Sequence, residues 1–165
     1  MQALEGYRLL DFGTAVAGPQ VGQLLADMGM EVIKIETRVK LDGMRRGRPI
    51  VGDDIAGGDE GKWPDAQPYF HVTNRNKLSF TINLKHLGAM DVFTRMVKIS
   101  DVVLDNSSPG VMARLGLDHA NLVKVRPDVI SISLTACGES GPMRDTLVYA
   151  PLIIALGGME SFVVT

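Results

Sequence analysis

The chain contains only one cysteine and three histidines, and this scarcity excludes two classes of small protein. Cys137 has no second cysteine with which to form an internal disulfide, so a disulfide scaffold is excluded. The histidines His71, His86 and His119 are scattered and lack the ligand spacing of a structural zinc site. Neither disulfides nor structural zinc therefore organise this chain.

An excess of positive charge and a long hydrophobic run are also missing. Seventeen lysines and arginines stand against 19 acidic residues, so the net charge of -2 disfavours a general binder of nucleic acid or anionic membranes. No apolar run approaches the ~18 residues of a membrane span, and the first residues lack a signal-peptide pattern. With 165 residues, 45% of them hydrophobic, we expect one soluble, cytoplasmic globular domain.

Short apolar strands alternate with amphipathic helices along most of the chain. The predicted strands are 7–12, 31–36, 78–84, 101–105 and 128–135, with 78–84 near a sheet edge. The predicted helices are 20–29, with Pro19 in the first turn, 87–97, 111–117, 119–125 and 149–156, the last of them buried. This order predicts an α/β fold with a doubly wound, mostly parallel, Rossmann-like sheet. Ligands of such a sheet bind beyond the carboxyl ends of its strands.

The first of these strand ends leads into the small residues 13–19 and then a helix. Unpaired N–H groups and the positive dipole end of a helix suit a phosphate. The segment lacks both the G-x-G-x-x-G and the Walker patterns, so a plain strand-to-helix turn is the alternative, and a nicotinamide-dinucleotide enzyme is disfavoured. Glu36 ends the second strand, where a dinucleotide fold places its ribose-binding acid; a solvated carboxylate is the alternative there.

Residues 37–67 have little apolar periodicity, which predicts a long loop. Six cations lie within the fifteen residues 34–48, which span the end of the preceding strand and the start of this loop, and only Glu36 and Asp42 balance them: Lys34, Arg38, Lys40, Arg45, Arg46 and Arg48. A basic loop at the strand ends can bind nucleotide phosphates or a dicarboxylate through charge-assisted bonds, whereas a solvated charge run is the alternative.

Three further segments carry polar groups. Residues 74–77 place Lys77 where it is free to reach an anion, with a turn before a strand as the alternative. Asn106 and Arg114 follow another strand, where donors converge on a ligand or simply cap a helix. Cys137 has no histidine beside it in sequence, and its loop lacks the G-x-S-x-G elbow, so a cysteine or serine nucleophile is disfavoured.

A series of short motifs occurs in one order along nearly the whole chain. They are Leu4-Glu5-Gly6 to Asp11, Ala17-Gly18-Pro19, Leu24 to Gly29, Glu31 to Glu36, Asn74-Arg75-Asn76-Lys77, Asp101-Val102-Val103, Pro109 to Met112, Arg114-Leu115-Gly116 and Gly141-Pro142. Taken together, they closely resemble the amino-terminal part of the family III CoA-transferases. That family includes formyl-CoA and carnitine CoA-transferases and the related α-methylacyl-CoA racemases.

The resemblance implies a site for coenzyme A or acyl-CoA in the loops described above. It places Val16 and Ala17 beside the thioester, Arg38 at the nucleotide end, and Tyr149 in the lining of the pocket. It also implies that Lys77, Asn106 and Arg114 contact CoA. A ligand with three phosphates requires several cations, which this acidic chain concentrates in the same region.

The resemblance further implies an aspartate nucleophile that forms an aspartyl-CoA intermediate while CoA passes between small carboxylic acids. This aspartate is expected beyond Thr165, so no catalytic residue is expected within the chain, which alone should be inactive. Residues 1–165 then form the amino-terminal part of the large domain, without the small domain or the returning carboxyl-terminal segment. The rest of the protein or a second subunit would complete an interlocked homodimer or a heteromer.

Two alternatives remain within this resemblance. One is a non-catalytic CoA-binding subunit of a heteromeric transferase. The other is a relative of the acyl-CoA racemases, which place a histidine followed by an aspartate where this chain has Tyr149-Ala150. An imidazole is not available there to remove a proton, so a transferase is favoured over a racemase.

Overall fold

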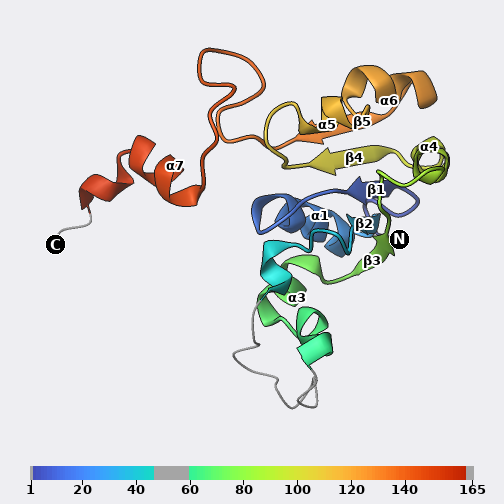
Figure 1. Cartoon of the computed structure of the whole chain (residues 1–165), viewed down its shortest axis with the longest axis horizontal. Helices are drawn as coiled ribbons and strands as arrows, with labels where there is room; N and C mark the ends of the chain where they lie inside the picture. The colour runs from blue at the N-terminus through green and yellow to red at the C-terminus, as the bar shows by residue number, and fades with distance from the viewer. Residues whose placement is uncertain (1, 47–59, 163–165) are drawn as a thin grey trace.

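The computed structural model of the protein describes residues 2–46 and 60–162 and contains one five-stranded sheet (Figure 1). The strands are β1 (Arg8–Asp11), β2 (Glu31–Glu36), β3 (Lys77–Thr81), β4 (Val102–Asp105) and β5 (Ile130–Ser133). They lie in the order β3-β2-β1-β4-β5, and each neighbouring pair is parallel. The predicted doubly wound α/β fold is confirmed, and β3 is an edge strand, as expected.

Helices follow most of the strands. They are α1 (Ala17–Asp27), α3 (Pro68–Asn74), α4 (Ala89–Lys98), α5 (Val111–Arg114), α6 (His119–Val125) and α7 (Ala150–Leu156), with short 3-10 turns at η1 (Gly43–Arg45), η2 (Glu60–Asp65) and η3 (Met159–Phe162). Helix α1 begins three residues before the predicted start, with Pro19 in its first turn. No helix in the described part of the chain is long and apolar enough to cross a membrane.

The sheet separates two hydrophobic clusters because successive residues of a strand point to opposite faces. Leu9 of β1 packs in a cluster with Ala26 of α1, whereas Leu10 packs in the other cluster with Phe93 and Val97 of α4. Each buried side chain of this size contributes roughly 1.5–3 kcal/mol through burial. The two faces therefore fix β1 at the centre of the domain.

The strand order reverses beside β1. The chain builds outward from β1 through β2 to β3 and then returns to form β4 on the other side of β1. The connections leaving β1 and β4 consequently diverge at the carboxyl edge of the sheet, the position where α/β folds bind ligands. The structure thus directs attention to the loops after β1 and β4.

The expectation of a buried helix at 149–156 is wrong. Helix α7 forms there, but its apolar side chains are exposed; Ile153 is 44% and Leu156 is 59% accessible. It packs against η3 and lies apart from the sheet (Figure 1). The apolar sequence was sufficient for a helix, whereas burial also requires a facing surface from another element.

The long loop predicted at 37–67 is partly structured. Its ends form η1 and η2, and α3 begins immediately after it at Pro68. Residues 47–59 of that loop, which include Arg48 of the basic run, lie outside the described residues.

Replacing Phe93 by alanine tests the core. Phe93 is 1% exposed and lies edge-on to Phe12, with ring centroids 5.3 Å apart. Phe93→Ala should lower the free energy of unfolding by about 3–5 kcal/mol in urea titrations because it leaves a cavity. Leu87, which is 96% exposed, provides the control: Leu87→Ala should change stability by less than about 0.5 kcal/mol. Equal effects of the two substitutions would contradict the packing described.

Candidate functional site

The loop between β1 and α1, residues 12–16, lies at the reversal point of the sheet and is bonded to several elements. Ala15 within it has a φ of 59°, an uncommon conformation for a residue with a side chain. A left-handed residue of this kind costs roughly 1–2 kcal/mol. The β1–α1 loop therefore needs specific contacts to keep its shape.

Asn106, immediately after β4, supplies one of those contacts. Its side-chain oxygen accepts the Thr14 N–H at 2.7 Å, and its Nδ2 donates to the Thr14 carbonyl at 2.9 Å. A side chain at Gly18 would lie 2.9 Å from the Asn106 amide, so glycine there permits the close approach of α1. Asn106 thus joins the two loops that diverge at the carboxyl edge.

Asp11, the last residue of β1, is completely buried and forms an ion pair with Lys77 of β3 at 2.7 Å. Its other oxygen accepts the Gly13 N–H at 2.7 Å. The Lys77 amino group also donates to the Pro19 carbonyl at 2.6 Å and to Asn74 Oδ1 at 3.0 Å. All three ammonium protons of Lys77 therefore have protein acceptors.

The environment of Lys77 determines its proton affinity. Burial lowers the pKa of its amino group below the ordinary value, because the charged form loses hydration, while the Asp11 carboxylate acts in the opposite direction. The sequence had indicated a lysine free to reach an anion. That expectation is corrected, since the ammonium group is enclosed and bonded within the protein.

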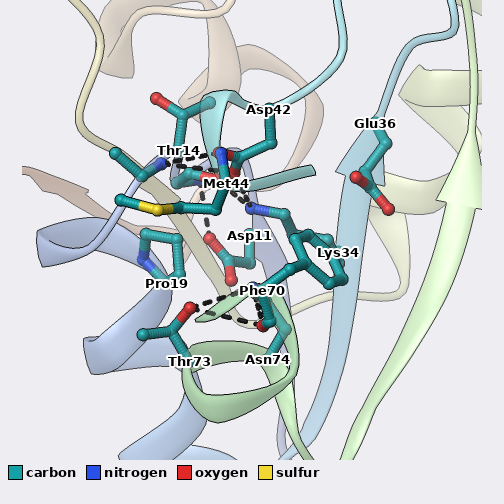
Figure 2. A network of polar contacts seen from close by, with 12 residues as sticks. Asp11, Thr14, Pro19, Lys34, Glu36, Asp42, Met44, Phe70, Thr73 and Asn74 are labelled. Carbon is teal, nitrogen blue, oxygen red and sulfur yellow. Dashed lines mark hydrogen bonds and ion pairs between the residues drawn. The ribbon is translucent and has the colours of Figure 1, made fainter. Parts of the chain in front are cut away.

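A second buried pair lies beside the first. Lys34 of β2 donates to the Gly13 carbonyl and lies 3.6 Å from the Asp42 carboxylate, with both side chains almost inaccessible. Asp42 also accepts the Ala15 N–H at 3.1 Å and the Met44 N–H at 2.9 Å. Figure 2 shows Lys34 and Asp42 pointing toward one another close to Asp11.

We call these four residues the buried charge cluster: Asp11, Lys34, Asp42 and Lys77. The cluster contains two ammonium and two carboxylate groups and is therefore neutral. Buried charges are tolerated when they are paired and hydrogen-bonded, and every member here contacts the opposite charge. Members of the cluster bond the backbone of the β1–α1 loop at Gly13 and Ala15.

Arg45 and Glu36 form a separate structural pair. Arg45 donates from Nε and Nη2 to the two Glu36 oxygens, each at 2.8 Å, and its guanidinium lies 3.4 Å from the Phe70 ring centroid. The sequence predicts either a ribose-binding acid or a solvated carboxylate at Glu36. Its side chain is 11% exposed and engaged by Arg45, so it is not a solvated carboxylate.

Other cations at the carboxyl edge stay open to solvent. Arg38 and Lys40 follow β2, and Arg114 ends α5. Their side chains are exposed and, within residues 2–46 and 60–162, no hydrogen bond or ion pair engages them. Val16 is 46% exposed, and Ala17 beside it is also exposed. The three cationic side chains therefore remain available to an anionic ligand.

The structure thus brings together only some of the predicted site residues. Val16, Ala17, Arg38, Asn106 and Arg114 all follow carboxyl ends of strands. Lys77 instead starts β3. Its amino group donates to Asp11 before the β1–α1 loop and to the Pro19 carbonyl after it. Tyr149 begins the separate helix α7, is 87% exposed, and does not lie with the others.

Asp11 and Asp42 were missed as site residues. A usable signal was nevertheless present, because Asp11 ends an apolar strand and Lys34 interrupts another. Charged residues in buried strands require partners. The pattern could have predicted that opposite charges meet there, but not which residues they are.

Comparisons with known proteins agree on one family. The protein-family model described as CoA-transferase family III matches residues 4–164 of this chain. A formyl-CoA:oxalate CoA-transferase of Afipia carboxidovorans is 37% identical over 161 residues, which cover 97% of this chain and 35% of that protein. The beta subunit of a succinyl-CoA–L-malate CoA-transferase of Chloroflexus aurantiacus is 34% identical over 156 residues, covering 94% and 36%.

The similarity extends to three-dimensional structure. The crystal structure of Rv3272 from Mycobacterium tuberculosis matches with a TM-score of 0.83 and 33% identity, covering all of this chain and 42% of that one. The chain therefore spans well under half the length of each of these relatives.

Lys77→Met tests the buried charge cluster. It leaves the Asp11 carboxylate without its closest cation, so the free energy of unfolding in urea should fall by about 3–5 kcal/mol. Adding Asp11→Asn removes the unpaired charge and should recover part of this loss, because the amide oxygen still accepts the Gly13 N–H. Lys98→Met on the exposed end of α4 is the matched control. If Lys77→Met lowered the free energy of unfolding no more than Lys98→Met, the buried ion pair between Asp11 and Lys77 would be contradicted.

Proposed function

Because the chain belongs to CoA-transferase family III, we propose that it binds acyl-CoA at the carboxyl edge of its sheet within an enzyme that moves CoA between carboxylic acids. The observation that carries this proposal is the family match over residues 4–164. The named relatives are CoA-transferases, which supports the general activity. The exposed cations at the same edge support the position of the site.

The nucleotide end of CoA is assigned to Arg38 and Arg114. CoA carries a diphosphate and a 3′-phosphate, and arginine recognises such groups through charge-assisted bonds. Both side chains are exposed at the carboxyl edge, on a chain that is acidic overall. Val16 and Ala17 at the start of α1 would border the thioester.

Lys77 and Asn106 act on the ligand in this proposal mainly through the loop. A direct contact of Lys77 with CoA requires one of its three protein bonds to be exchanged, and Asn106 already holds both polar atoms of the Thr14 backbone. Their predicted contacts with CoA remain part of the proposal. Tyr149 would line the pocket only when further protein holds α7 against the sheet.

The transfer itself would use an aspartate beyond Thr165. Its carboxylate attacks the acyl-CoA carbonyl, the carbon–sulfur bond breaks, and a mixed anhydride and CoA thiolate result. The thiolate then attacks the aspartyl carbonyl and releases the first acid, leaving an aspartyl-CoA thioester. The second acid repeats both steps in reverse. A carboxylate is a weak nucleophile, so the pocket must exclude water and stabilise the oxyanion.

The remaining machinery would come from the rest of the same protein or from a second subunit. The relatives are much longer than the matched region, which supports an incomplete site in this chain. The beta-subunit name of one relative favours a heteromer as an alternative to an interlocked homodimer. A non-catalytic CoA-binding subunit is the second candidate function for the same reason.

Arg38→Ala and Arg114→Ala should each weaken CoA binding to the complete protein about tenfold to a hundredfold, since a charge-assisted bond contributes roughly 1.5–3 kcal/mol. Isothermal titration calorimetry with CoA measures the effect. Arg95 is an exposed arginine of α4 and gives the matched control, with no expected change in affinity. CoA affinity unaltered by both site substitutions would refute the site.

Transfer activity separates the two candidate functions. The complete protein should move CoA from acetyl-CoA or succinyl-CoA to an isotope-labelled acid from a panel of small mono- and dicarboxylates, as detected by mass spectrometry. The 165-residue chain alone should not, because the proposed nucleophile lies outside it. Tight CoA binding by the complete protein, with no transfer to any acid until a second subunit is added, would favour the non-catalytic subunit.

A further inference from the structure

One carboxylate connects the segment proposed to bind CoA phosphates with the loop proposed to border the thioester. We call residues 37–46, which follow β2, the post-β2 segment; it contains both Arg38 and Asp42. Asp42 is 7% exposed, and Oδ1 accepts N–H groups from Met44 of its own segment and from Ala15, 27 positions away. Met44 and Ala15 are therefore bound to the same oxygen.

The bond from the Ala15 N–H to Asp42 is the last of the side-chain contacts that fix the loop backbone before α1 begins. Asp11 and Lys34 bind the backbone of Gly13, and Asn106 binds that of Thr14. Asp42 is the acceptor for the Ala15 N–H in the described part of the chain, and Ala15 is the residue with the positive φ. Release by Asp42 would thus free the strained residue directly before Val16.

The post-β2 segment is anchored on both sides of Arg38. At one end, Glu36 closes β2 and pairs with Arg45; at the other, Asp42 is buried against Lys34. The residues between these anchors, Arg38 to Lys40, are exposed. A ligand bound by Arg38 consequently restrains a short exposed stretch, and the first buried side chain after that stretch is Asp42.

We infer that Asp42 is a positioning residue that couples phosphate binding at Arg38 to the shape of the β1–α1 loop beside the thioester. This inference rests on the proposed function. Binding energy from a remote part of a substrate can be used to order groups at the reacting centre. Here, phosphates that restrain the post-β2 segment stabilise the arrangement in which Asp42 holds Ala15, and such coupling between two sites is reciprocal.

Adenosine 3′,5′-diphosphate tests the coupling because it contains the nucleotide end of CoA and lacks the pantetheine arm and thiol. In the complete protein, its binding should slow hydrogen–deuterium exchange at the Ala15 amide about fivefold or more, since opening of the bond from Ala15 to Asp42 becomes rarer. Residue-resolved mass spectrometry measures this. The nucleotide has no group that reaches the thioester, so protection there reports the coupling.

Asp42→Ala removes the acceptor of the Ala15 N–H and should retain nucleotide binding within about threefold, because the contact is only indirectly linked to the phosphate site. In this variant the nucleotide should no longer slow exchange at Ala15. Lys34→Met combined with Asp42→Ala removes the same acceptor without leaving a buried ammonium group unpaired. This double variant keeps the test valid if Asp42→Ala does not fold. In it too, nucleotide binding should leave exchange at Ala15 unchanged.

Asp27→Ala is the matched control. Asp27 also accepts side-chain hydrogen bonds, from Gln23, Arg75 and Asn76, but it lies at the opposite end of α1. This variant should show the wild-type protection. Nucleotide binding that does not protect Ala15 in the wild type, or protection of Ala15 that persists in both Asp42 variants, overturns the coupling and leaves the proposed function standing. Failure of the nucleotide and of CoA to bind overturns the proposed function itself.

Discussion

The ion pair between Asp11 and Lys77 joins β1 to β3 across the intervening strand β2 and fixes the start of α1 through the Pro19 carbonyl. It is buried on all sides, so each charge depends on the other for its solvation. The space for it comes from Gly22, where a side chain would lie 2.6 Å from the Asp11 carboxylate. Sheet, helix and loop therefore meet at one enclosed electrostatic contact.

The shape of the β1–α1 loop follows from this contact and its neighbours. Asp11 holds Gly13, Asn106 holds Thr14, and Asp42 holds Ala15, so three consecutive backbone positions are bonded to three different parts of the chain. A loop held in this way can keep a residue in an unfavourable backbone conformation. It also presents exposed positions at the start of α1 in a defined arrangement, which suits the thioester site proposed there.

In the basic run that begins within β2, some cations stabilise the fold and others remain available for binding. Lys34 and Arg45 are enclosed by carboxylates and cannot contribute strongly to an external field. Arg38 and Lys40 are exposed and retain their charge for a ligand. The sequence predicted a basic segment correctly but treated its cations alike. It could not separate them, because the acids that neutralise Lys34 and Arg45 are chosen by the path of the backbone.

The alternation of apolar strands and periodic helices by itself determined the α/β fold, and the order of motifs determined the family. Each strand, helix or motif is a local signal within one element, and their order is visible along the chain without any knowledge of contacts. The tertiary structure alone decided that Lys77 and Asn106 face the protein, through partners 66 and 92 positions away, and that α7 lacks a covering surface. Hydrogen bonds act over about 3 Å, so which distant polar groups meet is settled only when the chain has folded.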